Sequence, residues 1–133
     1  MLDIFDILGP VMVGPSSSHT AGAVRIGRMA RTLLDGRPVR AEIGLYGSFA
    51  ETGRGHGTDR ALVAGLLGMA PDNLEVPNSF AIAAEQGLEF AFQTVQLRDA
   101  HPNTAVLDVT AEDGHRLVLR AVSTGGGRIR VEQ

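Results

Sequence analysis

The chain contains no cysteine and no lysine, and all 12 of its basic residues are arginine. Without lysine it cannot form a Schiff base with pyridoxal phosphate or with a carbonyl substrate. Without cysteine it cannot bind an iron–sulfur cluster through thiolates, supply a thiol nucleophile or build a disulfide scaffold. Any chemistry that needs one of these groups must therefore come from a partner chain.

Tryptophan is also absent, aromatic residues make up only 5% of the chain, and the net charge is −3. The scarcity of aromatic side chains argues against a stacking surface for single-stranded nucleic acid, and the negative charge argues against non-specific binding to DNA or RNA. No apolar run approaches the roughly 18 residues of a membrane span, and the acidic N-terminus lacks the basic region of a signal peptide. We therefore expect a cytoplasmic protein with a single globular domain over residues 1–133.

A dense polar stretch, Gly14–Thr20, carries four hydroxyls and one imidazole at positions 16–20. A Gly-Pro turn opens it and a helical pattern follows, so one of its hydroxyl residues is expected to cap a helix N-terminus. Helix N-termini bind carboxylates and phosphates, and histidine is readily poised as a general base near neutral pH. The stretch predicts a site for the carboxylate of an amino or hydroxy acid, with His19 as the candidate base. The alternative is a helix cap with spare surface serines.

A second polar stretch, Gly53–Asp59, also precedes a helical pattern. It lacks the Gly-Lys-Ser/Thr ending of a phosphate-binding P-loop. It also does not match the dinucleotide fingerprint, which needs a strand, a glycine motif, a helix and then a parallel strand. Two interpretations stay open. One is a turn with a helix cap at Thr58 or Asp59, and the other is a loop whose glycine backbone and His56 approach the same ligand as His19.

Two later motifs are less specific. His101–Thr104 stands at a strand entrance, where a connecting turn is the favoured interpretation. Gly125–Gly127 allows close approach of its backbone to a ligand or to another chain, although a flexible hairpin explains it equally well. His115 is expected to be a solvated turn residue. No spacing of histidine, aspartate and glutamate resembles a standard metal motif.

Hydrophobic periodicity divides the chain into an early helical part and a late strand part. Helical spacing predicts a short helix over 2–8, then helices over 20–35, from 59 to about 68, and over 78–87; arginines 25, 28 and 31 form a solvated face of the second of these. Alternation predicts strands over 39–46, 90–98, 104–111, 116–124 and 128–132, with Asp113-Gly114 as a hairpin turn. This order favours an α+β fold: a two-layer sandwich with helices on one face of a mostly antiparallel sheet of four to five strands.

Taken together, the motifs resemble the beta chain of iron–sulfur-dependent L-serine dehydratase, over essentially the whole chain. The motifs that carry the resemblance are, in chain order, Gly14–Gly22 with Arg25–Gly27, Tyr46–Ala50 with Thr52–Asp59, His101–Thr104 and Gly125–Gly127. The resemblance implies an L-serine ammonia-lyase that converts L-serine to pyruvate and ammonia and is inactive without its alpha chain. In this family the cysteine-containing alpha chain holds a [4Fe–4S] cluster, one iron of which acts as a Lewis acid on the substrate hydroxyl.

The resemblance also assigns roles to residues of this chain. His19 matches the family histidine that is a candidate base. The glycine-rich loops predict close association with a second copy, in a homo-oligomer, or with the alpha chain. No residue of this chain is expected to bind a metal. The residues expected to line the substrate site are Ser16, Ser17, Ser18, Thr20, His56, Gly57, Thr58, Asp59, Gly125 and Gly126.

The family's beta domain is similar to the allosteric substrate-binding domain of some phosphoglycerate dehydrogenases, a two-layer module that binds anionic effectors. Many beta chains carry an ACT domain after the matched region, and none is expected within these 133 residues. The alternative function is therefore a non-catalytic regulatory module of the same fold that binds an anion or an amino acid. The serine–histidine stretch favours the enzyme subunit, because an effector site would more naturally rely on arginine or lysine.

Overall fold

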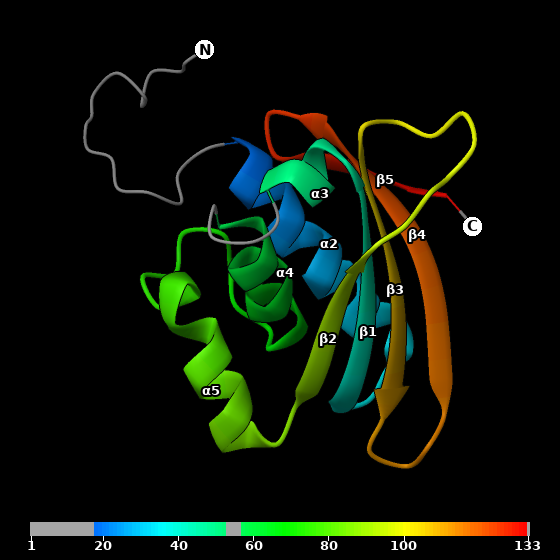
Figure 1. The fold of residues 1–133 in the computed structure, drawn as a ribbon. Helices are drawn as coiled ribbons and strands as arrows, with labels where there is room; N and C mark the ends of the chain where they lie inside the picture. Colours follow the sequence, from blue (N-terminus) through cyan, green and yellow to red (C-terminus); the bar gives the residue numbers. More distant parts are fainter. Residues whose placement is uncertain (1–17, 53–56, 133) are drawn as a thin grey trace.

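One mixed sheet of five strands forms the first layer of the structure, a computed structural model that describes residues 18–52 and 57–132 (Figure 1). In spatial order the strands are β2 (Glu89–Thr94), β1 (Pro38–Gly47), β3 (Asn103–Ala111), β4 (Arg116–Gly125) and β5 (Arg128–Glu132). β1 and β2 are parallel, and the other neighbouring pairs are antiparallel. The predicted α+β class with a mostly antiparallel sheet is confirmed. The expectation that no parallel strand follows the Gly53–Asp59 stretch is wrong, because β2 is that strand.

Helices form the second layer and cover one face of the sheet (Figure 1). α2 (Ser18–Leu34) packs on β4 and also contacts β3 and β5. The connection from β1 to β2 contains, in order, α3 (Ser48–Thr52), α4 (Thr58–Leu66), the 3₁₀ turn η2 (Val76–Asn78) and α5 (Ser79–Gln86). No helix within the described residues is long and apolar enough to cross a membrane. The helix expected over 2–8 lies outside the described residues.

The short helix α3 was not expected, because its five residues carry no periodic pattern of their own. Tertiary contacts hold it in place: the Ser48 N–H donates to the Pro102 carbonyl at 2.7 Å, and the Phe49 side chain is fully buried. Long-range contacts of this kind are absent from local sequence patterns, so periodicity alone could indicate only where β1 ends.

The core lies between the two layers and follows the period-two pattern of the strands. In β1, Ala41, Ile43 and Leu45 are buried under the helices, while Arg40 and Glu42 are exposed on the opposite face. Burying a side chain of the size of leucine contributes roughly 1.5–3 kcal/mol each. The largest fully buried side chains are Phe49, Ile26, Leu34, Ile43, Leu62, Leu66, Leu107 and Leu119.

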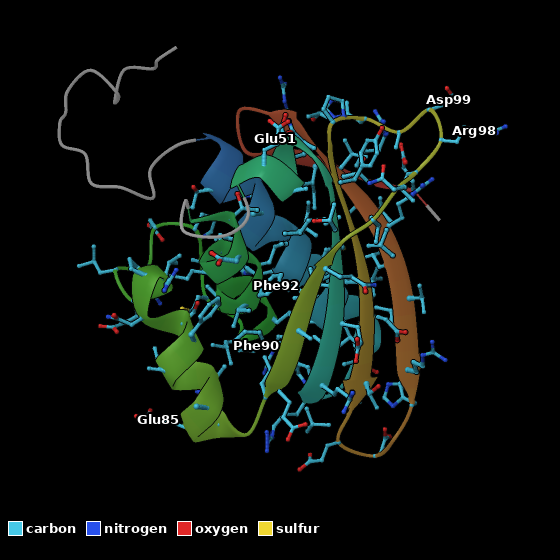
Figure 2. The ribbon with its side chains drawn as sticks, in the orientation of Figure 1. Glu51, Glu85, Phe90, Phe92, Arg98 and Asp99 are labelled. Carbon is cyan, nitrogen blue, oxygen red and sulfur yellow. The ribbon has the colours of Figure 1, made fainter. Side chains whose placement is uncertain are left out.

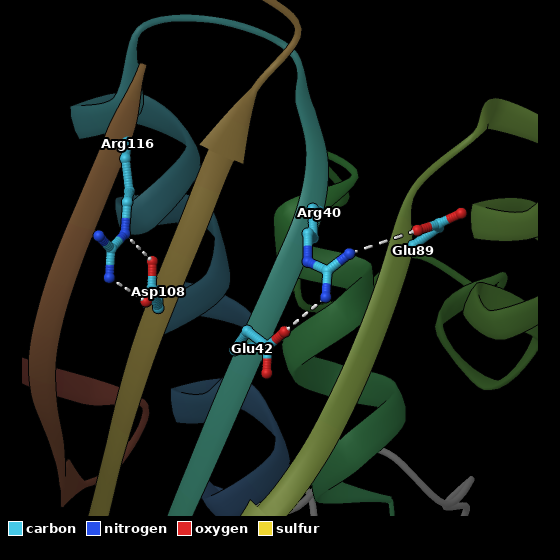
Figure 3. Close-up of polar contacts among 5 residues, drawn as sticks. All are labelled: Arg40, Glu42, Glu89, Asp108 and Arg116. Carbon is cyan, nitrogen blue, oxygen red and sulfur yellow. Dashed lines mark hydrogen bonds and ion pairs between the residues drawn. The ribbon is translucent and has the colours of Figure 1, made fainter. Parts of the chain in front are cut away.

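The face of the sheet opposite the helices is polar and carries a shallow hollow of about 500 Å³. Ion pairs cross its strands (Figure 3). Arg116 donates two hydrogen bonds of 2.7 Å to Asp108, and Arg40 contacts Glu42 at 3.0 Å and Glu89 at 3.8 Å. A solvated face of this composition is usual for sheets with antiparallel pairs.

His115 is exposed beside the β3–β4 turn, as the sequence suggested, and its ring also makes two hydrogen bonds. Its Nε2 atom is hydrogen-bonded to the carbonyl of Leu34 in the last turn of α2, and its Nδ1 atom to the Asp113 carboxylate. The Leu34 carbonyl and then Asp113 raise the pKa of His115 above its usual value. The imidazole therefore ties the C-terminus of α2 to the β3–β4 hairpin.

The arginines of α2 lie on a largely solvated face, as predicted, and two of them also bind other elements. Arg25 Nη1 donates to the Gly127 carbonyl at 2.8 Å, and Arg31 Nη1 donates to the Leu66 carbonyl at 2.8 Å. Arg25 and Arg28 are exposed, as expected, and Arg31 is half-buried. Two of the three arginines thus tie α2 to other elements of the fold.

Candidate functional site

Segments from three of the sequence motifs meet at the N-terminal end of α2 (Figure 1). A methyl group placed on Gly57, just before α4, would lie 3.8 Å from Thr20 Oγ1 in the first turn of α2. A methyl group on Gly127, in the β4–β5 turn, would lie 3.6 Å from the Ala21 Cβ atom. Positions about 40 and 100 residues away from α2 in the sequence therefore pack against its first turns.

The start of α4 depends on a glycine. Gly57 precedes the helix with φ 103°, a left-handed conformation that favours glycine. Thr58 and Asp59 follow in the first turn and are buried, with 2% and 6% of their surface exposed. Asp59 Oδ1 accepts a hydrogen bond of 2.7 Å from the Arg60 N–H. The N-cap residue, Gly57, has no side chain that could cap the helix, and the Asp59 carboxylate instead binds one N–H of the first turn.

The β4–β5 turn lies on α2 because Arg25 binds it. Gly125, Gly126 and Gly127 all have positive φ, and the carbonyl of Gly127 accepts the Arg25 hydrogen bond. One turn earlier in α2, a methyl group on Gly22 would lie 2.2 Å from Ser123 Oγ in β4. The N-terminal half of α2 is therefore held directly against β4 and its turn.

The His101–Thr104 motif forms the connecting turn that the sequence favoured. His101 Nδ1 accepts the Asn103 N–H at 2.9 Å, and Thr104 Oγ1 donates to the His101 carbonyl at 2.6 Å. The Pro102 carbonyl in turn binds the start of α3. These bonds place the turn and α3 at the same end of the sheet as the first turn of α2, where Glu51 of α3 is exposed (Figure 2).

The predicted site residues divide into those that the structure places and those that it does not describe. Thr20, Gly57, Thr58 and Asp59 are placed at this end, and so are Gly125 and Gly126 of the β4–β5 turn. Ser18 and His19 are the first two residues of α2, although their side chains lie outside the description. Ser16, Ser17 and His56 lie outside the described residues.

Sequence reasoning missed two residues that shape this end. Arg25 was expected only to be solvated, and its hydrogen bond to the β4–β5 turn was not foreseen. Ser123 was seen only as part of the glycine-rich segment, although it is 1% exposed and contacts Gly22. The available signal was the small residue at position 22 on the apolar side of the helix, because a missing side chain inside a helix often marks close packing.

Two helix starts contribute to the electrostatics of this end. Two helices of nine or more residues, α2 and α4, begin here, and helix N-termini carry a partial positive charge and free N–H groups. At the start of α4 one such N–H group, that of Arg60, already binds the Asp59 carboxylate.

Comparison with known proteins decides the family. Residues 1–86, well over half of the chain, match the family described as serine dehydratase beta chain. The chain belongs to the serine dehydratase beta chain family. A probable L-serine dehydratase beta chain from Bacillus subtilis (strain 168) is 46% identical over 130 residues, which is 98% of this chain and 59% of that protein.

Two further relatives extend the comparison. The L-serine dehydratase beta chain of Peptoniphilus asaccharolyticus is 43% identical over 128 residues, which is 96% of this chain and 58% of that protein. L-serine dehydratase 2 of Escherichia coli (strain K12) is 40% identical over 82 residues, or 18% of that longer protein. This member of the serine dehydratase beta chain family thus spans less than two-thirds of the beta chains that it resembles.

Proposed function

We propose that this chain is the beta subunit of an L-serine dehydratase, which converts L-serine to pyruvate and ammonia together with an alpha chain. The observation that carries the proposal is the meeting of the α2 start, the α4 start and the β4–β5 turn at one end of the fold. The names of the relatives support the substrate, and the match to 18% of a longer L-serine dehydratase supports a second catalytic part.

Substrate binding in this proposal uses the backbone at the two helix starts. Backbone N–H groups at the starts of α2 and α4 bind the carboxylate of L-serine, because helix N-termini carry a partial positive charge. The substrate site in this proposal also includes the hydroxyls of Ser16, Ser17, Ser18 and Thr20. The glycine turn, held by Arg25, brings backbone rather than side chains against the first turns of α2.

The chemistry in this proposal assigns one proton transfer to this chain. His19 removes the Cα proton of L-serine, and the β-hydroxyl group leaves with a proton as water. The resulting enamine tautomerises to an imine, and water hydrolyses the imine to pyruvate and ammonia. A positioned general base contributes about 10²–10⁴ in rate.

The residues of this chain do not fit an iron–sulfur cluster. The 133 residues include no cysteine, and within the described ranges no three histidine, aspartate or glutamate side chains gather as a metal site. We therefore assign the [4Fe–4S] cluster to the alpha chain, and we expect that chain to associate with the end of this chain that carries the helix starts.

The test is anaerobic co-purification with the cognate alpha chain, followed by steady-state release of pyruvate from L-serine. His19→Ala is expected to lower kcat by about 10²–10⁴ with an unchanged melting temperature. His115→Ala is the matched control, because it removes a histidine of the β3–β4 hairpin that contacts the opposite, C-terminal end of α2. The His115→Ala variant is expected to have the same kcat as the wild type.

Two outcomes would contradict parts of the proposal. A near-normal kcat for His19→Ala would move the base to His56 or to the alpha chain. A wild-type complex that binds L-serine and releases no pyruvate would favour the non-catalytic regulatory module instead.

A further inference from the structure

Strand β5 is one edge of the sheet in the described part of the chain, so one of its sides has no neighbouring strand. An edge strand presents unpaired N–H and C=O groups, and proteins commonly protect them with proline, lysine, a bulge or a covering segment. The sequence of β5 is Arg-Ile-Arg-Val-Glu, and the one irregularity of its pairing adds a residue to β4 rather than to β5. β5 is therefore a regular edge that can pair with a further strand.

The helix side of this edge carries exposed apolar surface. Val131 lies opposite the buried Ala121 of β4, so it is on the face that α2 covers, and 37% of it is exposed. On α2, Arg25 binds the β4–β5 turn, and Met29 and Leu33 follow it at spacings of four. Met29 is half-buried, and Leu33 is 50% exposed. Exposed apolar side chains of both layers thus lie along the same edge.

The side chains of β5 are complementary to those of a second β5 strand that runs antiparallel to it. In a symmetric pair centred on Arg130, Arg128 lies opposite Glu132 of the second copy, and Ile129 lies opposite Val131 of the second copy. The symmetry produces each of these pairs twice. Opposite charges and apolar side chains that lie directly across from each other stabilise antiparallel strands.

This register also accounts for the charge at its centre. The two copies of Arg130 lie opposite each other, but each guanidinium donates to Glu132 of its own chain at 2.8 Å and 3.2 Å and so brings its own counter-charge. Arg128 is exposed and forms no ion pair within the described ranges. A pair centred on Ile129 would instead place Arg128 against Arg130, and like charges directly opposite each other destabilise a strand pair.

The other edge of the sheet, β2, lacks this complementarity. Glu89 is its one charged residue, so no antiparallel pairing of β2 with itself brings opposite charges together. The rings of Phe90 and Phe92 pack on Phe80 of α5, with centroids 4.7 Å and 6.2 Å away (Figure 2). The complementarity for a second copy is therefore specific to β5.

We propose that two copies of this chain associate through their β5 strands, which pair antiparallel in the register centred on Arg130. The result is one sheet of ten strands, five from each copy, with both α2 helices on the same face. The contact is isologous, as in most symmetric dimers. Main-chain hydrogen bonds supply the affinity of such strand addition, and the side-chain pairs supply its specificity. The inference does not depend on the proposed function.

The first test is sedimentation of the purified chain. The wild type is expected to be a dimer at about 100 µM, far above the dissociation constant of a micromolar dimer. Arg128→Glu and Glu132→Arg each place like charges opposite each other twice, so each should raise the dissociation constant about tenfold or more. An equal mixture of these two variants restores both opposite-charge pairs, so it should form a heterodimer within about threefold of the wild-type affinity. Arg98→Glu, at an exposed position between β2 and β3, is the matched control and should change nothing.

The second test concerns the apolar pairs. Val131→Lys places a charge opposite Ile129 of the second copy and should raise the dissociation constant about tenfold or more. Val118→Lys is the matched control, because Val118 is 52% exposed on the neighbouring strand but lies on the open face of the sheet. It should leave the dissociation constant unchanged. Circular dichroism checks that each variant has the fold of the wild type.

Four results would overturn the proposal. One is a wild-type chain that stays monomeric at about 100 µM. The second is a dimer that none of the β5 variants weakens, and the third is a dimer that Val118→Lys weakens instead, which would place the contact on the open face. The fourth is a pair of charge variants that fail to associate when mixed. A monomeric wild type whose complex with the alpha chain is weakened by Arg128→Glu would assign this edge to the alpha chain.

Discussion

Gly27 of α2 and Gly65 of α4 lie against each other at the crossing of the two helices. A methyl group on Gly27 would lie 2.3 Å from the Leu62 carbonyl oxygen and 2.9 Å from the Gly65 Cα atom. A methyl group on Gly65 would lie 2.1 Å from the Val24 carbonyl oxygen and 2.8 Å from the Gly27 Cα atom. The backbones are too close for any side chain, so this crossing sets the distance between the two helix starts.

We expect Gly65→Ala to destabilise the chain, although alanine favours a helix interior by roughly 0.5–1 kcal/mol over glycine. The added methyl group must displace backbone, and overpacking of this kind costs about 1–3 kcal/mol or more. Urea unfolding measures the effect. Thr32→Ala, at an exposed position of α2, is the control and should change the free energy of unfolding by less than about 0.5 kcal/mol. A Gly65→Ala protein that is more stable than wild type would show that the helices are not in close contact.

Arg25→Ala is expected to impair substrate binding more than stability. The variant loses the hydrogen bond to the Gly127 carbonyl, which holds the β4–β5 turn on the first turns of α2. A hydrogen bond of this kind contributes about 1 kcal/mol, or about fivefold in KM for L-serine in the reconstituted enzyme. Arg28→Ala removes an exposed arginine three residues further along the same helix and should leave KM unchanged. Equal effects of both variants would mean that only the charge of α2 matters.

The stability of the chain should fall at alkaline pH because of His115. Both ring nitrogens face acceptors, the Leu34 carbonyl and the Asp113 carboxylate, and only the protonated ring can donate to both. The pKa of His115 is raised by these two groups, so its contribution is complete below the unfolded value of about 6.5 and is lost as the pH rises through the folded pKa. Unfolding at a series of pH values should show this loss in the wild type and not in His115→Ala. An imidazole pKa at or below the unfolded value in an NMR titration would exclude the mechanism.

The Asp108–Arg116 pair on the open sheet face gives the opposite pH dependence. The hydrogen bonds from Arg116 lower the pKa of Asp108, so this contribution is present above the unfolded pKa and is lost as the pH falls through the folded value. The pair is largely exposed, so Arg116→Ala should cost no more than about 1 kcal/mol near neutral pH. Acid unfolding curves of the wild type and of Arg116→Ala should converge at low pH. Curves that stay equally far apart at every pH would mean that Arg116 acts through packing.

Local patterns predicted the elements of the fold well and their partners poorly. The alternation of Ala41, Ile43 and Leu45 identified β1, and Asp113-Gly114 identified the β3–β4 hairpin, because these signals depend on neighbours in the sequence. The parallel pairing of β1 with β2 depends on contacts across more than 40 residues and leaves no local signature. Pairing of distant strands had to come from the structure.

The same division holds for the candidate site. The clusters of glycine and hydroxyl residues indicated which loops matter, and the structure brings Gly57 and Gly127 to the start of α2. The partners of Arg25 and His115 are backbone carbonyls 102 and 81 residues away. A carbonyl looks the same at every position of a sequence, so no residue type could have indicated these bonds.

The parallel pairing of β1 with β2 also bears on the order of folding. β3, β4 and β5 are joined by short turns, whereas β1 meets β2 only after a connection that contains α3, α4 and α5. Closing a long loop costs entropy before any contact compensates it, so non-local pairing is slow. We expect the three-stranded meander to form early and the β1–β2 pairing late. The start of α4 lies inside that long connection, so we expect the candidate site to be assembled in the last stage of folding.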